Sequence, residues 1–337
     1  MQSRLWHALS IDDVGYSRRP KSIFQMTELR IRDIPIEGDS YVLGEVIDFQ
    51  TALPVEVCDG CMIERASPAT QSFLSQLVDS LLFLGGNPFE LERDPETKKV
   101  TPLPQVDWRY FILRHADEYI PVAVLKAAAL IEPSVYLGPR FSNVRGNRSV
   151  GSSPGIQNHY WSTHRWWNAG KSITDQTVSD WGTIAKQLAL VEAEYPEIGR
   201  SVHMFWILGG NDPSVDRLTI LGYFIVIESL LTHRPDPKDP TDSIGRQIRS
   251  KMRLLGNRMA SPLNYQVFGD TDVAKIWPAL YDYRSVLAHG GSPDFGSGKL
   301  SRLKDEETVI TFLQTACRRL LCQAVEEPLL FLDLKEC

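Results

Sequence analysis

Hydrophobic and polar residues alternate with a period near two through much of the first third of the chain. Four segments there have strand-like patterns, and they cover residues 24–34, 40–49, 106–115 and 121–131. Such alternation is typical of strands that bury one face. The Asp59-Gly60 pair separates two short apolar runs, which is a strong signal for a two-residue hairpin. With one helix expected over residues 69–85, the pattern predicts a β-rich N-terminal region.

This pattern is lost in residues 137–155, which are rich in Gly, Ser, Asn and Arg and show no periodicity. Such a composition predicts a linker or a long loop. A chain of 337 residues is long enough for about two domains. We therefore expect a β-rich domain over residues 1–150 and a second domain over residues 151–337.

After the expected linker, hydrophobic residues recur every three or four positions, as they do on amphipathic helices. The expected helices cover residues 178–195, 215–231, 242–259 and 272–289, and a last one begins at residue 305. The second is apolar nearly all round, so we expect it at the centre of a bundle. The predicted fold class is α+β, with the β-rich domain followed by an all-α bundle.

Two of these helices also carry patterned charge. The third places its apolar residues in one sector of about 80°, and its other side carries Arg246, Arg249 and Arg253. That basic side is either a surface that contacts an RNA backbone or an ordinary solvated face. The last helix begins with acidic residues 305–307 and has an arginine pair, residues 318–319, further on. We expect both clusters to complement the helix dipole.

Composition and charge restrict the class of protein. A net charge of −6 gives no whole-chain reason for binding nucleic acid, so any polyanion must be met by a local basic patch. The first twenty residues lack an apolar signal-peptide core. The apolar run over residues 218–231 contains Glu228 and is too short to span a bilayer. Five scattered cysteines suit reduced thiols, so we expect a cytoplasmic protein without membrane contact.

One arginine interrupts the apolar side of the helix over residues 272–289. With Val273 placed at 0°, Arg284 falls at about 20°, inside the sector that holds Ile276, Leu280 and Leu287. A guanidinium keeps its charge on burial, and leaving it unpaired costs several kcal/mol. Arg284 must therefore meet a carboxylate, a helix C-terminus or an anion from outside.

A histidine ends the same helix. His289 lies about 140° around the helix from Arg284, and Gly290 is well placed as the residue that terminates the helix. Exposed carbonyls in the last turn favour the imidazolium form. A histidine that titrates near neutral pH, beside a fixed cation, suits acid–base chemistry on a phosphodiester.

A structural interpretation of the same residues stays open. An arginine on an apolar side often makes a buried ion pair, and Glu228 in the central helix is an obvious partner. A histidine before two glycines can also be a simple C-cap.

The order of these residues resembles that of HEPN domains (higher eukaryotes and prokaryotes nucleotide-binding). The signature is an arginine, four to six residues and a histidine near the end of a helix, here Arg284-Ser-Val-Leu-Ala-His289 within "YDYRSVLAHG". The segments "LTILGYFIVIESLLTH", which contains Glu228, and "DSIGRQIRSKMRLLG" resemble the two preceding helices of such domains. The order is similar to that of the Apea-like branch, and the resemblance covers roughly residues 201–325.

The resemblance implies a metal-independent endoribonuclease that acts as a homodimer, with the two motifs meeting at the interface. His289 would be the general acid or base, Arg284 would stabilise phosphoryl charge, and Ser285 and Glu228 would support them. The RNA 2′-hydroxyl would attack the phosphorus, which explains selectivity against DNA. Family precedent points to bacterial defence or toxin-type growth arrest, with a trigger or antitoxin partner on the N-terminal domain.

The residue after the arginine departs from the usual pattern, because active members often carry Asn, Asp or His where this chain has Ser285. Some family members bind nucleotides or proteins without catalysis. A non-catalytic binding module, or a purely dimerising bundle with Arg284 paired to Glu228, is therefore the alternative function.

A further candidate is the CxxC pair Cys58 and Cys61. No second pair at zinc-finger spacing accompanies it, and the hairpin already explains the Asp-Gly between the two cysteines. The chain also has no Walker loop, dinucleotide fingerprint, HExxH or GxSxG motif. We expect no cofactor and no metal.

Overall fold

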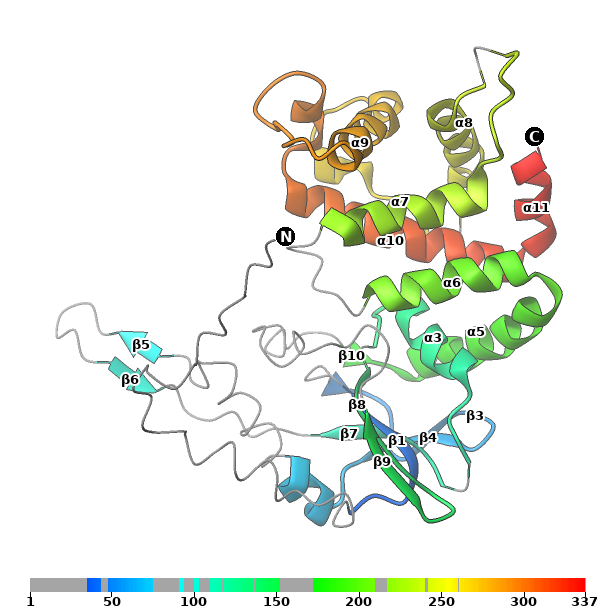
Figure 1. Ribbon diagram of the computed structural model, residues 1–337. Coiled ribbons are helices and arrows are strands. Elements are labelled where there is room, and N and C mark those ends of the chain that lie inside the picture. The colour runs from blue at the N-terminus through cyan, green and yellow to red at the C-terminus, as the bar shows by residue number, and fades with distance from the viewer. Residues whose placement is uncertain are drawn as a thin grey trace, which may run out of the picture.

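The computed structural model describes residues 35–43, 48–74, 91–93, 100–102, 110–116, 118–135, 137–151, 172–209, 217–239, 242–259 and 261–336. The fold of these residues is α+β, with an antiparallel sheet beside a set of packed helices (Figure 1). The strand expected over residues 24–34 lies outside the described residues. The helix expected over residues 69–85 is described as far as residue 74, and that part is helical from residue 68.

The main sheet has the strand order β3-β4-β7-β1-β8-β9, and every neighbouring pair is antiparallel. Its strands are β1 (Gly38–Leu43), β3 (Val55–Cys58), β4 (Cys61–Arg65), β7 (Phe111–His115), β8 (Leu137–Val144) and β9 (Asn147–Gly151). Two small pairings accompany it: β2 (Asp48–Phe49) with β10 (Ser172–Ile173), and β5 (Leu91–Arg93) with β6 (Val100–Pro102).

The hairpin expected at Asp59-Gly60 is confirmed. These two residues join β3 to β4 with φ values of 43° and 79°, the positive pair that a type I′ turn requires. Cys58 and Cys61 are therefore cross-strand partners, and both are buried.

The structure corrects two expectations in this half of the chain. Residues 121–131, predicted as a strand, form helix α3 (Val122–Leu130). Its residues Val124 and Leu125 pack in the core under the sheet, whereas Ala123 and Leu130 join the core of the helices. A segment buried on two sides is apolar throughout, and periodicity cannot then separate helix from strand.

The second correction concerns the linker. Residues 137–151 form the hairpin β8–β9, which turns at Arg145-Gly146 with φ values of 52° and 81°. Strand β9 is the edge strand of the sheet, and residues 145–149 are exposed. Because polar residues therefore occupy both of its faces, the sequence shows no alternation of hydrophobic and polar positions there. The sheet therefore continues to residue 151, and residues 152–171 lie outside the description.

The helices after the sheet are α5 (Asp175–Glu194), α6 (Pro196–Gly209), α7 (Arg217–Leu231), α8 (Ile244–Gly256), α9 (Val273–Ala288), α10 (Glu306–Glu326) and α11 (Pro328–Glu336). Two short 3-10 helices, η4 (Tyr265–Phe268) and η5 (Leu300–Leu303), lie between them. All the expected helices of this half are confirmed, whereas α6 and α11 were not anticipated. No helix within the described ranges is long and apolar enough to cross a bilayer.

Helices α3 and α5 form a layer between the sheet and the remaining helices (Figure 1). Trp181 of α5 is fully buried there and donates its indole N–H to the carbonyl of Val124 in α3 at 2.8 Å. Gly182 of α5 lies against the backbone of β3. Beyond this layer, α7 packs against α6, α8, α9, α10 and α11, which confirms its central place.

The charges of α10 serve two different purposes. Asp305 caps the helix by accepting the N–H of Thr308 at 2.7 Å, as the acidic start predicts. Arg318 and Arg319 lie well before the C-terminus, so the expectation that they complement its dipole is wrong. Arg318 instead donates to the carbonyl of Ala129 at 3.2 Å and so stabilises the C-terminal end of α3.

The close approach at Gly182 gives a test of this packing. A Cβ at that position would lie 2.2 Å from the carbonyl oxygen of Val57, so Gly182→Ala must push β3 away from α5. We expect a loss of about 1–3 kcal/mol in the free energy of unfolding by urea. Gly256→Ala is the matched control, because nothing lies within 4 Å of its added Cβ. The control should be neutral or stabilise by up to about 1 kcal/mol, and equal stability of both variants would contradict the packing.

Candidate functional site

Helix α9 carries the arginine and the histidine and is capped at both ends. The Asp272 side chain accepts the N–H of Ala274 at 3.0 Å and begins the helix. At the other end Gly290 has a φ of 72°, and Gly291 donates to the carbonyl of Val286 at 2.9 Å. This is a Schellman ending with His289 as the C-cap, and it confirms the role expected for Gly290.

Arg284 is held by Glu228 of the central helix α7. Its Nε lies 3.1 Å from Oε1 and its Nη2 lies 3.5 Å from Oε2, while Nη1 takes no part in the pair. The arginine side chain is 29% exposed and the glutamate side chain 16%. The pair is therefore half-buried, and solvent reaches part of the guanidinium.

The ring of Tyr281 lies under the same guanidinium, with 5.8 Å between the arginine Cζ and the ring centre. Burial raises the pKa of Tyr281, and the Glu228 carboxylate raises it further, so the phenol stays neutral. The sequence interpretation missed this tyrosine, although a residue three positions before Arg284 is its neighbour on a helix surface. Tyr281 also faces Gly245 in the first turn of α8.

His289 is exposed at the C-terminal end of α9, away from the contact between Arg284 and Glu228. Its backbone N–H donates to the carbonyl of the half-buried Ser285 at 3.2 Å. Within the described part of the chain, no hydrogen bond joins its ring to Arg284. Arg217, at the start of α7, donates to the carbonyl of Gly291 at 3.2 Å, which places that end of α7 beside the histidine turn.

The predicted basic side of α8 is present, because Arg246, Arg249 and Arg253 are all exposed while the opposite side of the helix is buried. Helix α8 packs against both α7 and α9, so this basic side belongs to the helices that hold Arg284.

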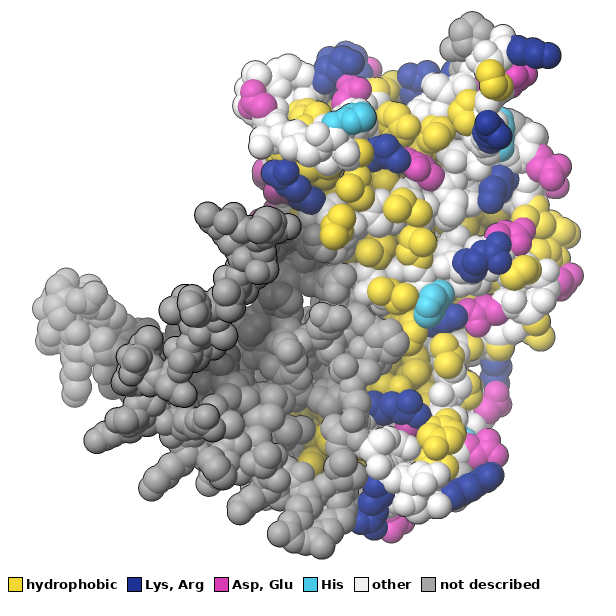
Figure 2. Space-filling model, in the orientation of Figure 1, with side chains coloured by type: hydrophobic (Ala, Val, Ile, Leu, Met, Phe, Trp, Pro, Cys, Tyr) yellow, Lys and Arg dark blue, Asp and Glu magenta, His cyan; other side chains and the backbone are white. Residues whose placement is uncertain are grey.

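Exposed hydrophobic residues lie on α7, the helix that holds Glu228, and on the neighbouring α6. Leu218 is 72% exposed and Ile225 is 45% exposed, and both lie within about 80° of Glu228 on the surface of α7. Met204 and Ile207 of the neighbouring α6 are each 37% exposed. Figure 2 shows hydrophobic side chains gathered over this face of the helices, with charged and histidine side chains beside them. We call these four residues the α6–α7 apolar surface.

The cysteine pair offers no comparable site. Cys58 and Cys61 are buried across the hairpin, and the thiol–thiol hydrogen bond lowers the pKa of Cys58 while it raises that of Cys61. Among the described residues, no group of three or more His, Cys, Asp or Glu could hold a metal ion.

Comparison with known proteins adds no family name. No protein-family model, no curated protein and no solved structure matches this chain.

The strength of the Arg284–Glu228 pair can be measured with a double-mutant cycle. Arg284→Met and Glu228→Gln keep the approximate side-chain shapes and remove the charges. We expect a coupling energy of about 1–3 kcal/mol in urea unfolding, because a charged hydrogen-bonded pair is partly withdrawn from water. The pair Arg258–Glu327 is the control, since its side chains are 56% and 33% exposed and its coupling should be clearly weaker. Equal coupling of the two pairs would show that burial does not strengthen the Arg284 pair.

Proposed function

We propose that this protein is a HEPN-type endoribonuclease that cleaves RNA without a metal ion. The observation that carries the proposal is the half-buried Arg284, oriented by Glu228 and still open to solvent, on the helix that ends at the exposed His289. A fixed cation and an imidazole on one helix, both open to solvent, suit the cleavage of a phosphodiester.

In the proposed reaction His289 removes the proton of the RNA 2′-hydroxyl. The 2′-oxygen bonds to the adjacent phosphorus, the bond from phosphorus to the 5′-oxygen breaks, and a protonated His289 returns the proton to that oxygen. The products are a 2′,3′-cyclic phosphate and a free 5′-hydroxyl. Arg284 would stabilise the negative charge that develops on the phosphoryl oxygens.

Glu228 has a positioning role in this scheme. It binds Nε and Nη2 of Arg284 and so fixes the plane of the guanidinium, while Nη1 stays outside the pair. A phosphate of the RNA would accept a hydrogen bond from Nη1, or it would replace the Glu228 carboxylate at one of its two contacts. Ser285 lies one residue further along α9 and would hydrogen-bond the phosphate or the histidine.

The proposal includes a homodimer formed through the α6–α7 apolar surface. Single exposed hydrophobic residues are ordinary, but four of them on two packed helices, one of which holds Glu228, suit a second copy of the same chain. Arg284 and His289 point about 140° apart on one helix. Two converging motifs remove this difficulty, because an arginine and a histidine from different protomers need not share a helix face.

The remaining parts of the proposal concern regulation and place. Residues 1–150 would sense a trigger or bind an antitoxin, the basic side of α8 would track the RNA backbone, and the protein would act in the cytoplasm during defence or growth arrest. The fold agrees with such coupling, because α3 packs both under the sheet and against the helices.

A second candidate function is a non-catalytic binding or dimerisation module. Two observations favour it: Arg284 already has an internal carboxylate partner, and Ser285 stands where active HEPN enzymes often carry Asn, Asp or His.

Incubation of the full chain with total RNA in the presence of EDTA separates the two functions. We expect cleavage that continues under chelation, and losses of at least about 100-fold in Arg284→Ala and His289→Ala. Arg258→Ala is the control, since that arginine pairs with Glu327 away from the motif. Mass spectrometry should find 2′,3′-cyclic phosphate ends. Intact RNA with folded wild-type protein would favour the binding module.

Two leucines of equal exposure provide a test of the proposed dimer interface and its control. Leu218 on α7 and Leu190 on α5 are each 72% exposed, but only Leu218 belongs to the α6–α7 apolar surface. We expect Leu218→Glu to weaken the dimer by at least about 100-fold, because each of two copies loses a buried side chain and gains a buried charge. Leu190→Glu should leave it unchanged. Sedimentation velocity measures both, and a monomeric wild-type protein would exclude this interface.

A further inference from the structure

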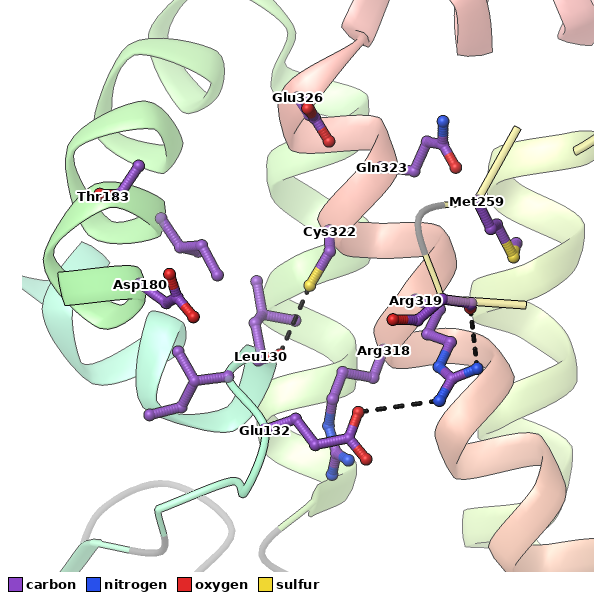
Figure 3. Close-up of a pocket in the computed structure, with 13 residues that line it drawn as sticks. Leu130, Glu132, Asp180, Thr183, Met259, Arg318, Arg319, Cys322, Gln323 and Glu326 are labelled. Atoms are coloured by element: carbon purple, nitrogen blue, oxygen red, sulfur yellow. Dashed lines mark hydrogen bonds and ion pairs between the residues drawn. The ribbon is translucent and has the colours of Figure 1, made fainter. Parts of the chain in front are cut away.

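A pocket lies where the layer of α3 and α5 meets α10, and it contains neither Arg284 nor His289. Its volume is about 290 Å³, which is space for roughly ten water-sized groups. The pocket is lined by the C-terminal end of α3, the first half of α5, the second half of α10 and the residues just after α8 (Figure 3). A ligand of about ten non-hydrogen atoms would therefore touch four segments that are far apart in sequence.

The body of the pocket is apolar. Leu130, Ile131, Ile184 and Met259 line it, together with the thiol of Cys322. That thiol donates to the carbonyl of Leu130 at 3.4 Å, and burial raises its pKa to about 11. Cys322 is therefore a neutral, weakly polar part of the wall, and the pocket suits an aliphatic group rather than a metal ion or a thiolate reaction.

One polar end of the pocket is formed by Arg319. Its Nη1 donates to the carbonyls of Ser261 and Pro262, which fix the guanidinium in place. Its Nη2 lies 3.9 Å from a carboxylate oxygen of Glu132, and that glutamate is 63% exposed. Its Nε is buried and has no hydrogen-bond partner within the described residues. A ligand cannot reach this buried Nε, so the donor that can meet one is Nη2, whose distance to Glu132 is longer than a hydrogen bond. A carboxylate or carbonyl oxygen is therefore the group that this end lacks.

The other polar groups of the pocket are acidic. Asp180 of α5 and Glu326 of α10 are exposed at its rim. Figure 3 shows Asp180 and Arg319 on opposite sides of the pocket. Arg318 also belongs to the lining, but it is already bonded to Ala129 and Ser134.

The charges select the class of ligand. The lining holds three carboxylates, those of Glu132, Asp180 and Glu326, against two arginines. This excess of negative charge disfavours a phosphate or a nucleotide. A molecule with one anionic and one cationic group, joined by an aliphatic body, matches both ends.

We propose that this pocket binds a small zwitterion with an apolar body, of the class of a free aliphatic α-amino acid. Its carboxylate would accept from Nη2 of Arg319, in place of the distant Glu132, and its ammonium group would face Asp180 and Glu326. The aliphatic side chain would fill the space between Ile184 and Met259. Occupancy would bridge α5 to α10 across the end of α3.

A regulatory role for this pocket rests on the proposed nuclease function. The binding of the zwitterion to the pocket does not depend on that function. Helix α10 shares its hydrophobic core with α7 and α9, so a ligand that stabilises α10 against the α3–α5 layer would act on the helices that carry Arg284. The binding experiment uses no RNA, and its result is therefore independent of the nuclease assay.

Thermal unfolding and calorimetry of the full chain with L-leucine test the proposal. We expect a saturable rise in Tm with L-leucine. Two analogues each keep one charge: 4-methylpentanoate lacks the ammonium group, and 3-methylbutylamine lacks the carboxylate. Each should bind at least about tenfold more weakly, because one polar end of the pocket stays unpaired. Inorganic phosphate should not bind, and equal binding of phosphate or of either analogue would overturn the zwitterion assignment.

Substitutions in the lining test whether L-leucine binds in this pocket. Arg319→Gln and Asp180→Asn should each weaken L-leucine binding at least about tenfold, and Arg302→Gln, outside the pocket, should not. Because Arg319 also fixes the chain at Ser261 and Pro262, its variant can fail to fold, and then Asp180→Asn decides.

Alkylation of Cys322 gives a second readout. L-leucine should slow the reaction of Cys322 with N-ethylmaleimide, followed by mass spectrometry, and leave the fully buried Cys317 unaffected. No rise in Tm with L-leucine, or unchanged alkylation at saturation, would overturn the proposal.

Discussion

The ion pair between Arg284 and Glu228 is the constraint on which the candidate site depends. A guanidinium cannot lose its charge, so a sequence that places one on the apolar side of α9 must supply a negative group nearby. The central helix α7 supplies it, and the two side chains fix α9 against α7. Because the pair is half-buried, it holds the arginine in one orientation and leaves part of it accessible.

A second constraint is the double burial of α3. This helix packs under the sheet with one side and against the helices with the other, and α10 holds its end through Arg318 and Cys322. The sheet and the helices are therefore joined through a shared layer. The sheet continues to residue 151, and α3 belongs to both cores.

The two proposed sites use different surfaces of one helical core. The Arg284 surface is built by α7 and α9, with α6 and α8 beside it, whereas the pocket is built by α3, α5 and α10. Both contain an arginine held by neighbouring acceptors, with a further terminal N–H group outside those hydrogen bonds. In each case the protein fixes the direction of the cation, and a ligand with the matching oxygen would complete its contacts.

The sequence by itself determined the local features of this protein. The period of hydrophobic residues located α5, α7, α8, α9 and α10, the Asp59-Gly60 pair located a hairpin, and Arg284 with Glu228 could be named as partners. These features depend on residues a few positions apart or on a charge that must be neutralised. Only the tertiary structure decided that residues 122–130 are helical, that residues 137–151 join the sheet, and that Arg318 and Arg319 bond to α3 and to the chain after α8. A segment buried on both sides, an edge strand and a long cationic side chain take their roles from neighbours distant in sequence, and no local pattern records those neighbours.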